Sequence, residues 1–148
     1  MNNIIHISSL DLPELKIYRN LTKSNKKSGH FEDSSIFIAE GIKTTEIALA
    51  AGLEPVSFLM EEKHAYGKAG GIMKTCPNIP AYLGPSDVIS SLTGYELTRG
   101  FLCAMKRPAP NNIEEICFNA KRLVILENVA DASNVGAIFR SAAALGMD

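Results

Sequence analysis

Arg122-Leu-Val-Ile-Leu-Glu-Asn-Val-Ala-Asp-Ala-Ser-Asn-Val-Gly-Ala-Ile-Phe-Arg-Ser-Ala-Ala-Ala-Leu-Gly146 is the stretch that decides the fold of this chain. Its apolar run at 123–126 is rich in branched residues, which predicts a strand covered on both faces in a parallel sheet. Asp131, Ser133 and Asn134 then offer side-chain oxygens that can cap a helix. The helix is predicted from about Asn134 to Leu145, with Gly146 as its C-terminal stop.

Arg140 lies off the apolar face of that predicted helix. At about 100° per residue, the packing face holds Val135, Ile138, Phe139, Ala142 and Ala143. The neighbours of Arg140 one turn away are Gly136, Ala137 and Ala144, so one long cation is surrounded by very small residues. A solvated face would interleave several charges at this spacing. The pattern therefore indicates that a ligand or another backbone approaches the guanidinium closely.

The same residues resemble motif 1 of the SpoU/TrmH family of RNA ribose 2′-O-methyltransferases, in the SPOUT superfamily. That family has an Asn-x-Gly-x-x-x-Arg frame, which falls here on Asn134, Gly136 and Arg140. Where a proline is common before the Asn, this chain has Ala132 and Ser133. The loop keeps its polar capping residues, and strand, loop and helix are predicted in the family's order.

The resemblance implies an S-adenosyl-L-methionine-dependent methyltransferase that modifies a ribose 2′-hydroxyl in tRNA or rRNA. The family's catalytic domain is dimeric and carries a deep C-terminal trefoil knot. By similarity, Arg140 is the catalytic arginine and Asn134 orients it or its loop. From the residues alone, the simpler interpretation is that Asn134 is only a helix cap and Arg140 only a surface cation. The cofactor pocket is expected in later family motifs that have no counterpart up to Asp148.

Composition bounds the chain as one or two small globular domains. It has 148 residues, a hydrophobic fraction of 46% and a net charge of −1, which argues against indiscriminate binding of polyanions. Three scattered cysteines form no Cys-x-x-Cys pair and favour reduced core thiols in a cytoplasmic protein. No apolar run approaches the ~18 residues of a membrane span, and no metal site is predicted.

A basic stripe is predicted in the first segment, from about Leu12 to Lys27. At helical spacing, Ile17, Tyr18 and Leu21 take one side. The other side holds only cations: Lys16, Arg19, Lys23, Lys26 and Lys27. The stripe is either a solvated amphipathic face or a phosphate-contacting RNA surface, and segregation in a nearly neutral chain favours the second.

The residues up to about 107 predict alternating strands and helices. Strands are expected at 34–41, 55–60, 79–83 and 99–107, and helices at 42–52 and 86–94, which suggests a largely parallel sheet. Pro80 suggests an edge position for the third of these strands. The stretch 61–73 is charged and rich in glycine, but it lacks the Gly-x-Gly-x-x-Gly spacing of a dinucleotide loop. His64 within it is expected to be a surface side chain.

The predicted fold is therefore α/β, with three segments. Residues 1–107 form a small α/β/α sandwich that resembles ribosomal RNA-binding proteins, as in the SpoU family, whose strand ends resemble Phe37–Gly41 and Gly100–Pro108. Residues 108–120 form a Pro- and Asn-rich linker. Residues 121–148 begin a SPOUT (trefoil-knot) methyltransferase domain with its first β-α unit.

Because a single β-α unit cannot complete an α/β layer, the chain is expected to be the N-terminal part of a longer enzyme or a truncated product. Alone it should bind S-adenosylmethionine weakly or not at all. Two alternatives stay open at this point. One is a non-catalytic RNA-binding module of ribosomal-protein type, and the other is a nucleotide-binding α/β protein of another class, for which no phosphate loop is found.

Overall fold

The computed structural model describes residues 3–9, 11–19, 21, 35–94, 96–97 and 100–148. The chain divides into two units, Met1–Pro108 (unit 1) and Ala109–Asp148 (unit 2), and each has its own architecture. In the described residues, no helix combines the length and the hydropathy that a membrane crossing requires.

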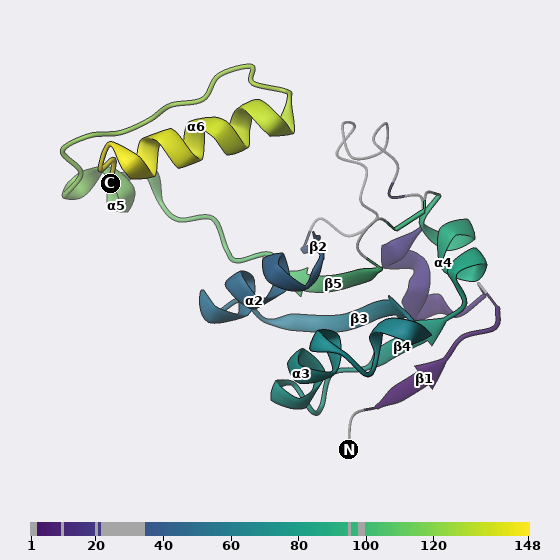
Figure 1. Ribbon diagram of the computed structural model, residues 1–148. Helices are drawn as coiled ribbons and strands as arrows, with labels where there is room; N and C mark the ends of the chain where they lie inside the picture. Colours follow the sequence, from purple (N-terminus) through teal and green to yellow (C-terminus); the bar gives the residue numbers. More distant parts are fainter. Residues whose placement is uncertain (1–2, 10, 20, 22–34, 95, 98–99) are drawn as a thin grey trace. The chain divides into compact units, whose positions relative to one another are not determined.

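Unit 1 is built on a mixed five-stranded sheet with the strand order β1-β4-β3-β5-β2 (Figure 1). The strands are β1 (Ile4–His6), β2 (Ile36–Glu40), β3 (Pro55–Glu61), β4 (Ala81–Gly84) and β5 (Phe101–Lys106). β1, β4 and β3 run parallel, whereas β5 is antiparallel to both of its neighbours, β3 and β2. β2 and β3 thus share a direction, but β5 lies between them.

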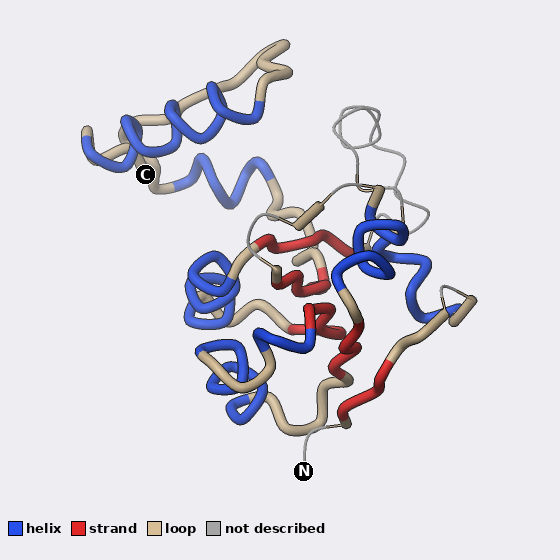
Figure 2. Tube along the Cα trace, turned by 45° about the vertical axis from the view of Figure 1, so that its right-hand side comes forward, coloured by secondary structure: helices blue, strands red, loops and turns tan. Residues whose placement is uncertain are grey.

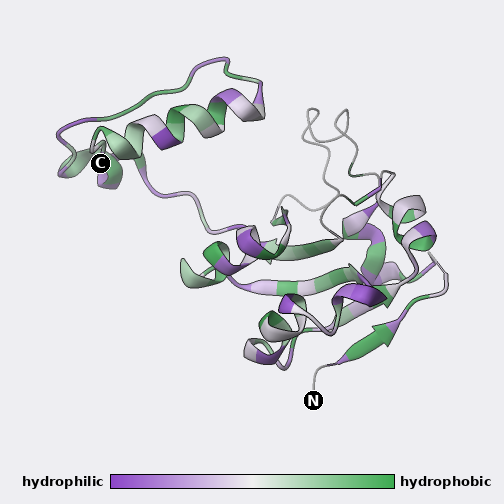
Figure 3. Ribbon diagram, viewed as in Figure 1, coloured by the Kyte–Doolittle hydropathy of each residue, from purple (hydrophilic) through white to green (hydrophobic). Residues whose placement is uncertain are grey.

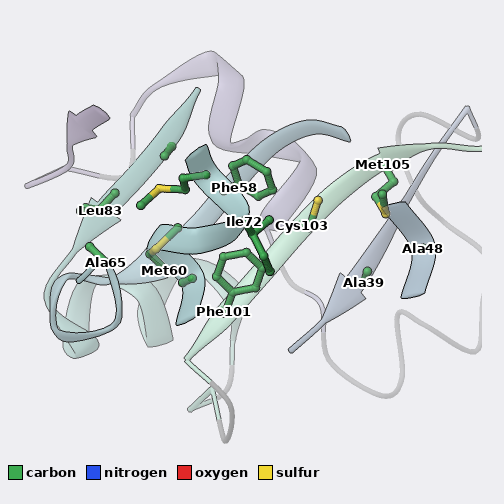
Figure 4. Packing of buried hydrophobic residues seen from close by; sticks show 13 residues of the cluster. Ala39, Ala48, Phe58, Met60, Ala65, Ile72, Leu83, Phe101, Cys103 and Met105 are labelled. Carbon is green, nitrogen blue, oxygen red and sulfur yellow. The ribbon is translucent and has the colours of Figure 1, made fainter. Parts of the chain in front are cut away.

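Helices cover both faces of this sheet (Figure 2). They are η1 (Pro13–Tyr18), α2 (Ile42–Ala50), η2 (Glu62–His64), α3 (Lys68–Thr75) and α4 (Ser86–Thr93). One core joins α2 and α3 to side chains such as Phe58, Phe101 and Met105 (Figure 4). The other joins η1 and α4 to the alternate residues Leu59, Leu102 and Ala104. Because successive strand side chains point to opposite faces, unit 1 is a three-layer sandwich.

Tyr18 ties η1 to an irregularity in the sheet. The register of β3 against β5 shifts between Pro55 and Ser57, and such a bulge leaves ladder groups without their usual partners. The Tyr18 hydroxyl donates to the Ser57 carbonyl oxygen (2.9 Å), lies 2.8 Å from Ser57 Oγ and accepts from the Ala104 N–H (3.3 Å). Tyr18 is completely buried, so its phenol satisfies backbone groups that water cannot reach.

Most predicted elements of unit 1 are confirmed, with four corrections. The sheet is mixed, not largely parallel, because β5 enters between β2 and β3. The strand at Ala81–Gly84 is internal, since Pro80 precedes it and β1, which was not predicted, forms the edge. The glycine-rich stretch contains the unpredicted helix α3. The first helix ends at Tyr18, because Arg19 is extended with φ −73° and ψ 139°.

Unit 2 contains two helices, α5 (Ile113–Phe118) and α6 (Ala132–Ala144), and no strand among its described residues. The prediction of a strand at 123–126 is wrong for this structure, because a strand needs a neighbour to pair its backbone N–H and C=O groups. α5 lies within the predicted linker 108–120, so that segment is partly helical; the Asn112 side chain caps it by accepting from the Glu114 N–H (3.1 Å).

Unit 2 buries none of the side chains that the structure describes in it. Figure 3 shows hydrophobic colours along much of α6 and the segment before it. The exposed large apolar side chains of unit 2 are Ile113, Ile116, Phe118, Leu123, Val124, Ile125, Phe139 and Leu145. The cysteines differ in the same way: Cys103 in unit 1 is buried, whereas Cys117 in unit 2 is exposed, against the prediction of core thiols. Burial raises the pKa of the Cys103 thiol to about 12.

Candidate active-site segment around Asn134 and Arg140

Local interactions define both ends of α6. Asp131 is the N-cap: its Oδ1 accepts from the Ser133 N–H (2.8 Å) and the Asn134 N–H (3.1 Å). Of the three capping candidates, Asp131 therefore performs the capping. Asn134 lies inside the first turn, and its exposed side chain has no hydrogen bond to another described residue.

The C-terminal end of α6 is a Schellman motif. The Gly146 N–H donates to the Ala143 carbonyl (3.1 Å) and the Met147 N–H donates to the Ala142 carbonyl (3.0 Å). Gly146 takes a φ of +65°, which only glycine adopts at low cost. The predicted glycine stop is confirmed.

Asp148 joins the end of α6 to Lys121 and Arg122. Its Oδ2 accepts from the backbone N–H groups of Lys121 (2.8 Å) and Arg122 (3.1 Å), and its own N–H donates to the Arg122 carbonyl (3.1 Å). This contact could not be predicted from the sequence, because no sequence pattern pairs residues so far apart. The contact holds residues 121–122 beside the end of α6 although no sheet does so.

Arg140 is exposed, and no ion pair of its guanidinium with another described residue is present. The side chain runs back along α6, since a Cβ placed on Gly136 would lie 3.6 Å from Arg140 Nη1. Glycine at that position therefore leaves the guanidinium uncovered on one side. The arrangement offers a permanent positive charge with a fork of N–H donors, which suits a phosphate or a developing oxyanion.

Only two of the five residues of the predicted basic stripe, Lys16 and Arg19, lie in the described part of the chain. Lys16 lies on η1 and Arg19 just beyond it, and both are exposed. Lys23, Lys26 and Lys27 lie outside the described residues. Because the backbone is already extended at Arg19, one continuous helical stripe from Lys16 onward is not formed.

Curated proteins with related sequences carry the name of tRNA/rRNA methyltransferases. The chain is 27% identical to an uncharacterized tRNA/rRNA methyltransferase of Mycobacterium bovis, over 93% of this chain and 47% of that protein. A relative of the same name from Mycobacterium tuberculosis shows the same identity and coverage. The chain thus spans about half the length of the curated relatives it matches. No protein-family model matches it.

Solved structures share the fold. An RNA 2′-O ribose methyltransferase aligns with 97% of this chain and 53% of its own, with a TM-score of 0.62 and 24% identity. The SpoU methyltransferase AviRb of Streptomyces viridochromogenes, solved with AdoMet, aligns with 92% of this chain and 49% of its own, with a TM-score of 0.59 and 16% identity. The resemblance to the SpoU/TrmH family that motif 1 predicted is therefore confirmed, in related sequences named tRNA/rRNA methyltransferases and in a mixed α/β fold shared with SpoU-type enzymes.

Proposed function

We propose that this chain is the N-terminal part of an S-adenosyl-L-methionine-dependent ribose 2′-O-methyltransferase that acts on tRNA or rRNA. Residues 1–107 would bind the RNA, and residues 121–148 would supply motif 1. The observation that carries the proposal is the exposed Arg140 guanidinium beside Gly136, on a helix that caps itself without Asn134. The names of the related sequences support it.

Arg140 acts in this proposal by electrostatics and positioning. A ribose hydroxyl is a poor nucleophile near neutral pH, so transfer of a methyl group to its oxygen needs alignment and help with the departing proton. An arginine carries a permanent charge and is unsuited to be a base. The Arg140 fork instead binds the neighbouring phosphate and stabilises negative charge on the hydroxyl oxygen as it develops.

Asn134 orients the same region. Its backbone N–H is already used by Asp131, whereas its side-chain amide has no other task among the described residues. An amide offers both a donor and acceptors. In the proposed enzyme it holds the Arg140 side chain or the substrate backbone in place.

Unit 2 does not by itself fit the methyl donor. A site for a ligand of this size buries most of the ligand's surface, but every side chain described in unit 2 is at least partly exposed. The AdoMet-bound neighbours support S-adenosylmethionine as the donor in the whole enzyme. We expect binding to the isolated chain to be weak or absent, and micromolar binding by calorimetry would contradict this.

Partners follow from the same proposal. The enzyme would be a cytoplasmic homodimer, and Lys16, Arg19, Lys23, Lys26 and Lys27 would contact RNA phosphates. The alternative of a non-catalytic RNA-binding module gains no support from the comparisons, because the related sequences carry methyltransferase names.

Substitution of Arg140 tests the proposal in the longer enzyme that it requires. Arg140→Ala should abolish 2′-O-methylation, measured as transfer of labelled methyl groups to tRNA and rRNA, and should leave RNA affinity within about twofold, because one of several phosphate contacts is lost. Arg122→Ala is the matched control, since it removes an arginine of unit 2 that lies outside the Asn134–Arg140 frame. Equal turnover of Arg140→Ala and the unaltered enzyme would reject the assigned role.

The coding sequence beyond Asp148 gives a second, independent test. Further strands with glycine-rich loops are expected if the chain is part of a longer methyltransferase. An immediate stop codon would contradict the proposal and would favour the RNA-binding module.

A further inference from the structure

Tyr66 stands out from the other aromatic side chains of unit 1. It lies between η2 and α3 and is 93% exposed, whereas Tyr18, Phe58 and Phe101 are completely buried. A tyrosine in water gains nothing from the hydrophobic effect that stabilises the fold. Its ring is therefore fully available to a partner.

The backbone on both sides of Tyr66 is held firmly. Ala65 is buried and its N–H donates to the Glu62 carbonyl (3.1 Å), and the Gly67 N–H donates to the His64 carbonyl (3.2 Å). The Ala65 carbonyl oxygen would lie only 2.6 Å from a Cβ on Gly70, so α3 packs directly on this turn. The exposed ring is thus presented by an ordered support, which lowers the entropy cost of binding.

His64 supports the same turn by packing against the backbone of Gly100. A Cβ on Gly100 would lie 2.2 Å from His64 Nε2, so the imidazole ring packs on the Gly100 backbone, just before β5. His64 is therefore a packing residue, and it is partly buried. The expectation that it is a plain surface side chain needs this correction.

Lysines flank Tyr66 in the sequence. The sequence from Lys63 to Thr75 contains the lysines Lys63, Lys68 and Lys74, and it contains no Asp or Glu. All three lysines are exposed, and Lys63 pairs with the buried carboxylate of Glu61. Lys68 and Lys74, at the two ends of α3, remain as cations that a polyanion can reach.

Gly71 adds an independent observation. It lies in the middle of α3, is exposed, has no positive φ, and a Cβ there would meet nothing within 4 Å. Neither strain nor packing within the described residues calls for glycine, which is unfavourable inside a helix. Gly67 is also exposed, and a Cβ there would have one heavy atom within 4 Å, the His64 carbonyl oxygen at 3.8 Å. Glycines so placed permit a ligand backbone to approach the helix closely.

We infer that Tyr66, Lys68, Gly71 and Lys74 form a docking surface for single-stranded RNA, in which an unpaired base stacks on the Tyr66 ring and the adjoining phosphates meet the lysines. The inference rests on the proposed function, because it names how unit 1 would hold its RNA. Aromatic rings bind unpaired bases of any identity by stacking, and lysines follow the phosphate backbone. Its residues are different from those of the basic stripe predicted at 16–27.

Fluorescence anisotropy with a 5′-labelled, mixed-sequence 20-nucleotide single-stranded RNA tests the inference on the whole 148-residue chain. Tyr66→Ala should weaken binding about 5- to 150-fold, the usual loss for one stacked base. Tyr66→Phe keeps the ring and should bind within about twofold of the unaltered chain. Ile47→Ala is the matched control, because Ile47 is an exposed apolar residue on another helix of unit 1.

Two further variants separate binding from folding. The chain contains no tryptophan, so Tyr66→Trp introduces a single tryptophan, excited apart from the tyrosines, whose emission should be quenched by the RNA and not by inorganic phosphate. Gly71→Ala should raise the melting temperature, because alanine favours the helix, and should nevertheless weaken RNA binding.

The outcomes are distinguishable. Normal RNA affinity of Tyr66→Ala, or unquenched emission of a Tyr66→Trp chain that has bound RNA, would overturn the inference and leave the proposed function intact. Absence of RNA binding by the unaltered chain at low salt would overturn the RNA-binding role proposed for unit 1, and the inference with it.

Discussion

Unit 1 and unit 2 have similar kinds of sequence pattern and different degrees of burial. Unit 1 places apolar side chains on both faces of a sheet and covers each face with helices. Unit 2 has an apolar run at 123–126 and an apolar helix face, and it buries neither. The difference shows that an apolar pattern specifies which face a segment would bury, whereas burial itself requires a second layer.

The two helices of unit 2 persist because their signals are local. The Asp131 cap and the Gly146 turn satisfy backbone groups within a few residues of α6. A strand has no such local solution, since its hydrogen bonds go to another segment. The strand predicted at 123–126 therefore fails where the helix beside it succeeds.

The largest expected effect is the loss of a core ring from unit 1. Phe101→Ala should lower the free energy of unfolding by about 3–5 kcal/mol, because Phe101 is completely buried and its ring centroid lies 5.7 Å from that of Phe58. Urea denaturation followed by circular dichroism measures the change.

Phe139→Ala in unit 2 is the matched control for that experiment. Its side chain is 65% exposed, so the change should stay within about 0.5 kcal/mol. Equal losses in the two variants would show that α6 is as well packed as the sheet, and would remove the contrast between the units.

A smaller effect is expected when the phenol that fills the β3–β5 bulge is removed. Tyr18→Phe should destabilise unit 1 by about 1–3 kcal/mol, because the buried Ala104 N–H and Ser57 groups lose their partner. Tyr66→Phe, at an exposed ring, should leave stability unchanged. A neutral Tyr18→Phe variant would mean that the bulge is satisfied in another way.

The pH dependence of the same variant sharpens this prediction. Burial, together with the neighbouring Cys103, raises the pKa of Tyr18 well above its ordinary value of 10.0, although a hydrogen bond with Ser57 lowers it in part. Above pH 10 the unfolded chain releases this proton and the folded chain keeps it, so the unfolded state binds fewer protons. The free energy of unfolding should therefore fall as pH rises, by at most about 1.4 kcal/mol per pH unit from this group. Tyr18→Phe should show a shallower fall above pH 10, whereas parallel curves would contradict the assignment.

The smallest effect is expected at the cap of α6. Asp131→Ala removes the acceptor for two N–H groups and should cost the helix about 1 kcal/mol, visible as faster hydrogen exchange in its first turn. Asp87→Ala is the control, because Asp87 lies in the first turn of α4 and α4 has no side-chain cap. Similar exchange rates for α6 with and without Asp131 would show that other contacts hold the helix.

The sequence anticipated the elements of unit 1 better than their arrangement. The helices at 42–50 and 86–93 follow from apolar spacing and glycine stops, and the strands at 55–61 and 101–106 follow from unbroken apolar runs. The position of β5 between β2 and β3 could not be predicted, because pairing depends on contacts between distant residues. β1 was missed because a three-residue strand has too little pattern to detect.

The candidate site, too, was predicted only in part from the sequence. Asn134, Gly136 and Arg140 were found from their spacing, but the choice of Asp131 as the cap required the geometry. The hydrogen bond from the Arg122 N–H to Asp148 could not be predicted, because no periodicity in the sequence encodes it. The same holds for the packing of His64 and Ala65 that supports the turn at Tyr66.

The amino-acid sequence by itself determined the local features: the α/β class, the extent of most helices, the Gly146 stop and the Asn134–Arg140 frame. These depend on side-chain type, capping and spacing over a few residues, which are written directly in the chain. Only the tertiary structure decided that the sheet is mixed, that Tyr18 fills its bulge, and that residues 123–126 remain unpaired. Each of these outcomes depends on which distant segment supplies a hydrogen-bond partner or a covering layer.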